Sequence, residues 1–240
     1  MLPKKYFFSF FDDPEHPNGE NIQIAGLDQV SFEQFIDKYG SRFRRICLNS
    51  CKSINDLSPL SKLENLEYIQ IAWNTQAETL WDMTRNTKLH TLILSSMSKM
   101  KSLKFIDTAP NLKVFWRGDG MWITGECESL FPLQNSSIEV LGFEFKKIND
   151  LDIEPLIKMK HLKELYCHPF MFELEQCVEF SFRRPDVIGN ISKPYINWGN
   201  GIMTVGKRGR MFPNPVDKKI LEKYEDRWNQ TLQKIKNTRL

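Results

Sequence analysis

Short segments with apolar residues at alternating positions recur along the chain at nearly constant spacing. Six of them start at Phe43, Leu66, Leu89, Leu112, Ile138 and Leu162, and the interval from Leu112 to Ile138 is slightly longer than the others. Their fourth residues are all apolar: Ile46, Ile69, Leu92, Phe115, Leu141 and Leu165. Their sixth residues are apolar in five of the six segments, and Arg117 is the exception. Because side chains alternate between the two faces of a strand, this pattern predicts six strands that each bury one face.

Two longer stretches of the chain are nearly the same. Residues 54–71 read INDLSPLSKLENLEYIQI, and residues 148–165 read INDLDIEPLIKMKHLKEL. Both run through an apolar return segment into the next predicted strand. A unit of this length cannot bury its apolar edge alone, but it can do so against a neighbouring unit. The pattern therefore predicts stacked α/β units, each with one strand and one return segment.

The stretch at residues 54–71 resembles the short, internalin-like class of leucine-rich repeats, in which Ile-x-Asp-Leu-x-Pro-Leu leads into Leu-x-x-Leu-x-x-Leu. The resemblance covers roughly residues 43–170. It implies an α/β leucine-rich repeat solenoid of about six degenerate repeats, each about 23–26 residues long, with a parallel sheet on its concave face and a cap at each end. The asparagine that closes the strand turn in this class is present only as Asn74, so the array is degenerate.

The flanking sequence predicts two caps. Residues 1–42 read as an N-terminal cap or divergent first repeat, with a strand near 21–27 and a helix near 31–43. Residues 43–182 form the predicted leucine-rich repeat array, and residues 183–240 a basic C-terminal cap. Open ends of a stacked array expose core and strand edge, which is why caps are expected.

The C-terminal cap is predicted to contain a hairpin around Gly199–Gly201 and an amphipathic helix over residues 214–235. Asn214 is the expected N-cap and Pro215 the first helical residue. The apolar stripe of this helix consists of Ile220, Leu221, Tyr224, Trp228, Leu232 and Ile235. The stripe has two interpretations: it closes the array, or it contacts a second copy or a partner. The chain is therefore expected to be a monomer or a weak homodimer.

Charge and cysteine content bear on the partner and the compartment. The net charge of the chain is +3, whereas residues 183–240 hold 13 Lys and Arg against 5 Asp and Glu. The five cysteines are an odd number without tight pairing, which is typical of free thiols in a reducing compartment. Asp12 and Asp13 interrupt the aromatic N-terminal run, and no apolar stretch reaches ~20 residues. The expectation is a cytoplasmic protein without a membrane segment.

The sequence gives only weak indications of a catalytic, nucleotide-binding or metal site. Gly201, Gly206 and Lys207 have the spacing of a phosphate-binding loop, but Arg208 replaces the required Ser or Thr and no helix follows at once. A nucleotide-dependent enzyme that uses Gly201–Lys207 is thus an alternative rather than the main hypothesis. The cysteines and histidines lack the paired spacing of a zinc site. No catalytic residue, metal or cofactor is predicted, and the chain is not expected to be an enzyme.

The basic turn Gly206–Arg210, with Arg183, Arg184, Trp198 and Phe212 elsewhere in the cap, supplies a second alternative, a nucleic-acid-associated protein. No known nucleic-acid-binding module is present, so a nucleic acid is not the expected partner. The main hypothesis is non-catalytic recognition of another protein. By analogy of fold alone, one context is a bacterial immunity or regulatory protein.

The predicted binding surface is the outward-facing side of the sheet. Solvated sheet faces rarely carry clustered aromatic residues, whereas protein-binding faces do. Tyr68, Trp116 and Tyr166 are expected at its centre, with Trp116 exposed and Arg117 turned outward beside Gly118. The full predicted set is Arg45, Tyr68, Gln70, Trp73, Thr91, Ile93, Val114, Trp116, Arg117, Asp119, Glu144, Glu164, Tyr166 and His168.

Overall fold

The computed structural model describes residues 19–118 and 125–239 and shows a mixed α/β fold. The chain divides into two compact units, Met1–Leu162 and Lys163–Leu240. This division falls inside the range 43–182 that the sequence predicted as one array. Eight strands belong to a parallel sheet that is open rather than closed into a barrel.

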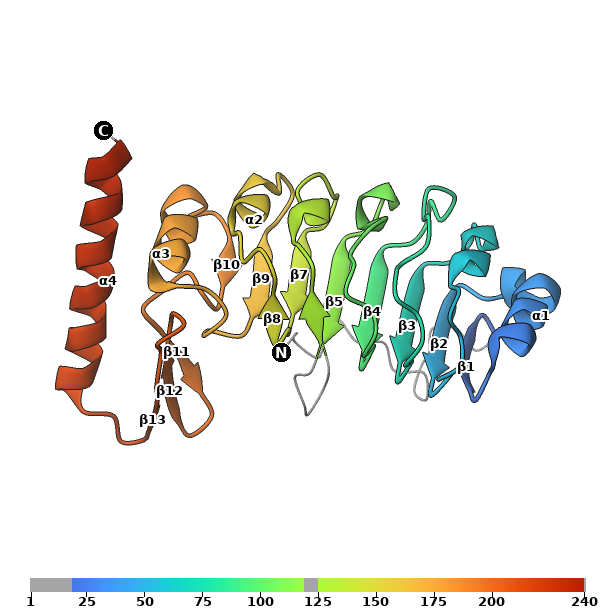
Figure 1. Ribbon diagram of the computed structural model, residues 1–240, viewed down its shortest axis with the longest axis horizontal. Helices are drawn as coiled ribbons and strands as arrows, with labels where there is room; N and C mark the ends of the chain where they lie inside the picture. The colour runs from blue at the N-terminus through green and yellow to red at the C-terminus, as the bar shows by residue number, and fades with distance from the viewer. Residues whose placement is uncertain (1–18, 119–124, 240) are drawn as a thin grey trace. The chain divides into compact units, whose positions relative to one another are not determined.

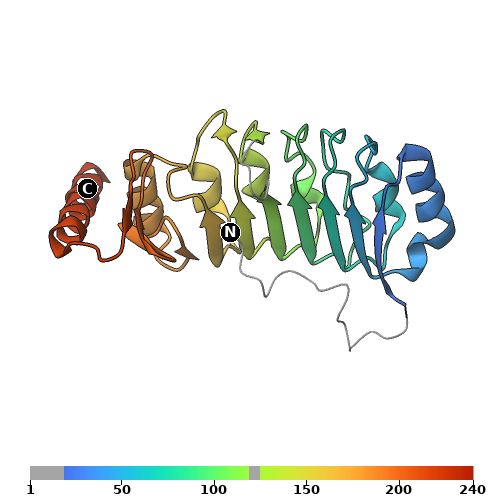
Figure 2. The ribbon, with the colours of Figure 1, turned by 90° about the horizontal axis from the view of Figure 1, so that it is seen from below.

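The first unit contains six strands of this sheet, which lie side by side in chain order (Figures 1 and 2). They are β1 (Asn21–Ala25), β2 (Arg45–Asn49), β3 (Tyr68–Ala72), β4 (Thr91–Ser95), β5 (Val114–Gly118) and β7 (Val140–Phe143). The register aligns Arg45 with Tyr68, Tyr68 with Thr91, and Thr91 with Val114, so the displacement from β2 to β5 is the same at each step. The strands predicted in this part of the chain are confirmed.

Short helices occupy most of the segments between these strands, whereas the segment between β3 and β4 contains none. The elements are α1 (Gln29–Tyr39), η2 (Gly40–Arg42), η3 (Ser58–Lys62), η4 (Ile106–Thr108), η5 (Phe131–Leu133) and α2 (Glu154–Lys158), with a small parallel pair β6 (Glu126–Cys127) and β8 (Lys147–Ile148). Proline occupies the first turn of η3, η5 and α2, where its missing N–H costs nothing and its fixed φ suits a helix start. Asp28 caps α1 through a hydrogen bond from the Ser31 backbone N–H.

The core of the first unit consists mainly of buried apolar side chains. The side chains of Ile46, Ile69, Leu92, Phe115 and Leu141 are between 0% and 1% exposed, as the alternating pattern predicted.

Two buried asparagines hold the loops behind the sheet. The Asn74 side chain donates to the Cys51 and Ile54 carbonyl oxygens at 3.0 and 2.8 Å. The Asn86 side chain donates to the Leu60 and Leu63 carbonyl oxygens at 2.9 and 3.0 Å. Both therefore satisfy buried carbonyl groups that belong to the preceding loop of the chain.

The second unit contains the remaining two strands of the parallel sheet, β9 (Glu164–Cys167) and β10 (Ile188–Gly189), and the helix α3 (Leu174–Arg183). A three-stranded antiparallel sheet follows, formed by β11 (Tyr195–Trp198), β12 (Gly201–Thr204) and β13 (Met211–Pro213). The predicted hairpin is confirmed, with Gly199 in the left-handed region at φ 44°. The helix α4 (Lys218–Arg239) ends the unit.

The helix α4 packs within the second unit through the predicted apolar stripe. Trp228 is buried, and the Tyr224 ring lies 5.8 Å from the Phe212 ring on β13. The predicted N-cap at Asn214 is wrong, because the helix starts only at Lys218. The Asp217 side chain instead accepts a hydrogen bond from the Lys219 backbone N–H at 2.9 Å, as an N-cap residue does. Across the described ranges 19–118 and 125–239, no helix is both long and apolar enough to cross a membrane.

Candidate partner-binding surface

Parallel pairing places many of the predicted surface residues in rows across one face of the first unit. One row contains Arg45, Tyr68, Thr91, Val114 and Val140, and the next contains Cys47, Gln70, Ile93, Trp116 and Gly142. The sequence therefore assigned these residues to a common face correctly. Glu164, Tyr166 and His168 belong to the second unit, where Glu164 and Tyr166 lie on β9.

The centre of this face is buried, which corrects the expectation of an exposed aromatic anchor. Trp116 is 4% exposed, Tyr68 4%, Thr91 5% and Ile93 0%. The Trp116 indole lies over Gly118, because a Cβ atom built at Gly118 would come within 2.5 Å of the Trp116 ring. The ring uses space that the glycine leaves empty two residues further along the same face. A side chain closed off in this way offers a partner almost no contact area.

The two tyrosine hydroxyl groups of the predicted surface make hydrogen bonds along their own strands. The Tyr68 hydroxyl donates to Gln70 Oε1 at 3.1 Å. The Tyr166 hydroxyl donates to Glu164 Oε2 at 2.6 Å. Each partner is two residues away and so lies on the same face of the strand. These bonds fix the aromatic rings against their own strands, and Gln70, Glu164 and Tyr166 remain half-buried.

Arg117 is buried in the core, so the expectation that it turns outward is wrong. Its side chain is 0% exposed, and Nη2 donates to the Met97 carbonyl oxygen at 2.6 Å. The guanidinium carbon lies 5.8 Å from the centre of the Phe145 ring, within the range of a cation–π contact. Strand alternation thus places Arg117 inward, like the apolar residues at the equivalent position of the other strands. A carbonyl group and an aromatic face solvate its charge. Asp119, also predicted at this surface, lies outside the described residues.

Trp73 is the predicted surface residue that is most available to a partner. It is 57% exposed, and within residues 19–118 and 125–239 every other predicted residue is buried or half-buried. It follows β3 directly, at the carboxyl end of the strand. Its backbone is in the left-handed region, at φ 57°. A bulky residue in this region is uncommon and carries a cost in free energy.

The turn that contains Trp73 has two close counterparts. Ser50 follows β2 at φ 54°, and Ser96 follows β4 at φ 54°. The backbone N–H groups of Ser50, Trp73 and Ser96 donate to the carbonyl oxygens at the end of the next strand, at 2.9, 3.0 and 2.9 Å. Serine adopts the same left-handed turn at the equivalent positions before and after Trp73, so the backbone does not require an indole there. Equal spacing in the sequence was the signal that these three positions are equivalent, but the flanking serines were not predicted as site residues.

The remaining predicted residues are half-buried within their own units. Arg45, Val114 and Glu144 are half-buried residues of the first unit. In the second unit His168 is half-buried, and its ring meets the Phe170 ring edge-on at 5.0 Å. The predicted trio of Tyr68, Trp116 and Tyr166 is therefore not an exposed cluster, since the first two are buried.

The cysteines are not in a reactive environment. All five are free and buried. Burial raises the pKa of Cys47 to about 11, and it raises the pKa of Cys127 and Cys167 to about 12. Because the thiolate is the nucleophile and the metal ligand, these thiols are poorly suited to either role near neutral pH. Across residues 19–118 and 125–239, no three His, Cys, Asp or Glu residues are placed to hold a metal ion.

The Gly201–Lys207 stretch has a geometry different from that of a phosphate-binding loop. Its first four residues form strand β12, paired on both sides, and Gly206 and Lys207 lie in the turn that follows. The Lys207 ammonium group pairs with the Glu173 carboxylate at 3.4 Å. In a phosphate-binding loop the glycine-rich backbone itself surrounds the phosphates and a helix follows. Here the backbone groups of residues 201–204 are instead engaged in the sheet.

Comparison with known proteins does not add an assignment. No model of a known protein family matches the sequence, and no curated protein matches it either.

Proposed function

We propose that this chain is a leucine-rich repeat solenoid that recognises a partner protein, without catalysis, at a surface centred on Trp73. The equal displacement between paired strands, the equivalent left-handed turns and the buried Asn74 support the repeat assignment. The proposed surface is the carboxyl end of β2, β3 and β4, where Ser50 and Ser96 flank the indole.

The observation that carries the proposal is an exposed tryptophan held in an unfavourable backbone conformation. A left-handed conformation costs an L-residue other than glycine about 1–2 kcal/mol. Burial of the indole compensates for only part of this cost, since Trp73 is 57% exposed. Strained residues of this kind are concentrated at functional sites. Tryptophan is also enriched among the residues that dominate binding energy at protein interfaces.

The flanking residues suit an anchor of this type. Ser50 and Ser96 are small and polar, and both are half-buried. Ala72, the residue before Trp73, is 7% exposed and apolar. A partner with an apolar pocket could cover the indole, while the serine hydroxyl groups and bound water satisfy polar groups at the edge. Anchors surrounded by weakly contributing polar contacts are typical of protein interfaces.

The proposal is tested with Trp73→Ser, which introduces the residue found at the two equivalent turns. Phe131→Ser is the matched control, because Phe131 is a large apolar residue of the same unit and is 62% exposed. Partners captured from a lysate of the native cells are identified by quantitative mass spectrometry and then measured against purified variants. The expected result is a partner that loses at least ~30-fold in affinity on Trp73→Ser, or about 2 kcal/mol, and keeps its affinity for the control. A captured partner that binds Trp73→Ser as tightly as the original chain would exclude this surface.

A further inference from the structure

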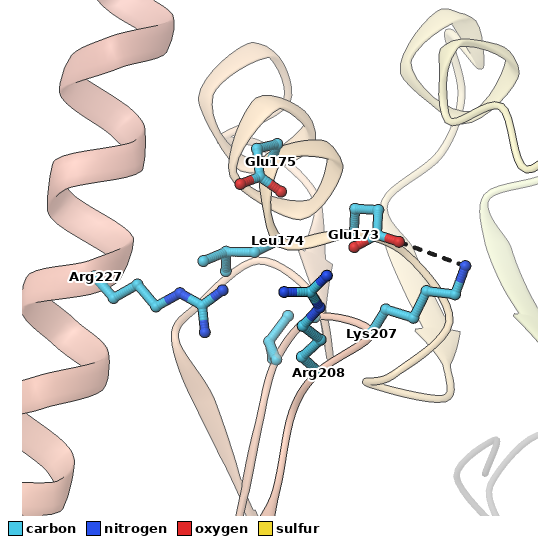
Figure 3. A pocket seen from close by; sticks show the side chains of 8 residues that line it. Glu173, Leu174, Glu175, Lys207, Arg208 and Arg227 are labelled. Atoms are coloured by element: carbon cyan, nitrogen blue, oxygen red, sulfur yellow. Dashed lines mark ion pairs between the residues drawn. The ribbon is translucent and has the colours of Figure 1, made fainter.

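The second unit contains a small pocket in which basic side chains from two separate elements meet. It has a volume of about 190 Å³ and lies between the start of α3, the turn after β12 and the middle of α4 (Figure 3). The basic residues at its edge are Lys207 and Arg208 from the turn and Arg227 from α4. No part of this pocket belongs to the Trp73 surface, so a ligand here would be independent of the proposed function.

The two arginine side chains point into the same space. In Figure 3 the guanidinium groups of Arg208 and Arg227 both extend toward Leu174, at the first turn of α3. Neither has an ion-pair partner among the residues that the structure describes. Both arginines are exposed to solvent and line the same pocket. An anion placed between the two guanidinium groups would be attracted by both.

The turn is shaped to bring its basic residues against the helix. Gly206 has φ 103°, a conformation that favours glycine, and its N–H donates to the Pro169 carbonyl oxygen at 2.9 Å. A Cβ atom at Gly206 would lie only 3.2 Å from the Leu174 backbone nitrogen. This close approach places Lys207 and Arg208 at the amino end of a ten-residue helix, where the helix dipole also favours a negative charge.

Two carboxylates also line the pocket and limit the charge it can accept. Glu173 pairs with Lys207, and its side chain accepts a hydrogen bond from the backbone of Gln176 in a capping box. Glu175 lies in the first turn of α3. With three cations and two carboxylates the lining has a net charge of +1. Such a pocket suits one compact anion rather than a highly charged polymer.

We propose that this pocket binds a single phosphate group, either as inorganic phosphate or as the phosphate of a small ester, held between Arg208 and Arg227. The planar guanidinium group presents paired N–H donors that match phosphate oxygens, so two arginines can together hold one group. A nucleic-acid strand fits less well. Its binding sites combine an extended basic groove with aromatic side chains for base stacking, and no aromatic residue lines this pocket.

The test is isothermal titration calorimetry of the full chain with sodium phosphate, with chloride used to hold the ionic strength constant. Arg208→Gln and Arg227→Gln should each weaken phosphate binding by about tenfold, the size expected when a charged hydrogen-bond donor is removed. Lys234→Gln is the control, since it removes one positive charge from α4 at a position outside the pocket. Glu173→Gln should strengthen binding, because it removes a negative charge and still offers an oxygen to cap α3.

The outcomes separate the alternatives. Saturable phosphate binding that both arginine variants weaken and Lys234→Gln does not supports the pocket, and tighter binding of glycerol phosphate than of inorganic phosphate would identify an ester as the ligand. Absence of saturable binding to both anions at millimolar concentration would overturn the proposal. Equal weakening by Lys234→Gln would also overturn it, because the response would then be to net charge. A single-stranded oligonucleotide whose binding ignores Arg208→Gln and Arg227→Gln, with no phosphate binding, would place any anion recognition elsewhere.

Discussion

Two tryptophans of the first unit, Trp116 on the sheet face and Trp73 at a strand end, occupy opposite environments. Trp116 is 4% exposed and lies over Gly118, whereas Trp73 is 57% exposed and adopts φ 57°. Alternation along a strand indicates which face a residue shares with its neighbours, but it does not indicate how much of that face is open. In this comparison, the position directly after a strand indicates better which side chain is exposed to a partner. The candidate partner-binding surface is therefore at the carboxyl ends of the strands rather than in the middle of the sheet.

The largest expected effect is on Trp116. Trp116→Ala should lower the free energy of unfolding by about 3–5 kcal/mol, because a large buried side chain leaves a cavity that the sheet cannot fill. Phe131→Ala, a change at an exposed residue, should alter it by no more than about 0.5 kcal/mol. Chemical denaturation followed by circular dichroism measures both. If Trp116→Ala is as mild as Phe131→Ala, the contrast between the two tryptophans does not hold.

A third tryptophan extends the comparison to the loops behind the sheet. Trp81 is 2% exposed, and its Nε1–H donates to Asn86 Oδ1 at 2.9 Å. Asn86→Ala removes that acceptor and also leaves the Leu60 and Leu63 carbonyl groups without their side-chain donor. The expected loss is about 2–3 kcal/mol in the free energy of unfolding. Asn65→Ala, at an exposed residue of the same unit, is the control and should be nearly neutral; equal midpoints for the two variants would contradict the role given to Asn86.

The smallest expected effect has the opposite sign. Trp73→Asn should raise the free energy of unfolding by up to about 1 kcal/mol, because asparagine tolerates the left-handed conformation better than tryptophan does. The same variant should lose partner affinity, so stability and binding would change in opposite directions. Thermal unfolding and a binding titration on one protein sample measure both. A destabilised Trp73→Asn would mean that the indole stabilises the turn, and the argument from strain would fail.

Much of the fold could be predicted because its main signals are local. Alternating apolar residues define each strand, and the constant spacing of these segments aligns them, so the parallel pairing of β2 to β5 followed from the sequence. The apolar stripe of α4 was also visible. The first residue of α4 could not be predicted, since Asn214 and Asp217 are both good capping residues. Only the three-dimensional path of the chain selects Asp217.

The candidate site was harder to predict because burial depends on distant parts of the chain. Arg117 was expected to turn outward, since a buried charge is costly unless it is solvated. The groups that solvate it, the Met97 carbonyl and the Phe145 ring, lie in other segments. The pocket around Arg208 and Arg227 likewise joins a turn and a helix that share no sequence motif. Trp73 was in the predicted set, but its prominence became clear only when its φ angle and exposure were known.

The hydrogen bonds of the left-handed turns have a consequence for how the molecule could change in length. The N–H groups of Ser50, Trp73 and Ser96 each reach the end of the next strand, at Ala72, Ser95 and Gly118. Duplication of residues 50–72 as a block would supply a new strand, a new turn and a partner for every such bond. Insertion or loss of one residue within the strand of the block would turn the core side chains that follow it to the opposite face of the sheet. A strand could therefore be gained or lost together with its whole block far more easily than it could gain or lose a single residue.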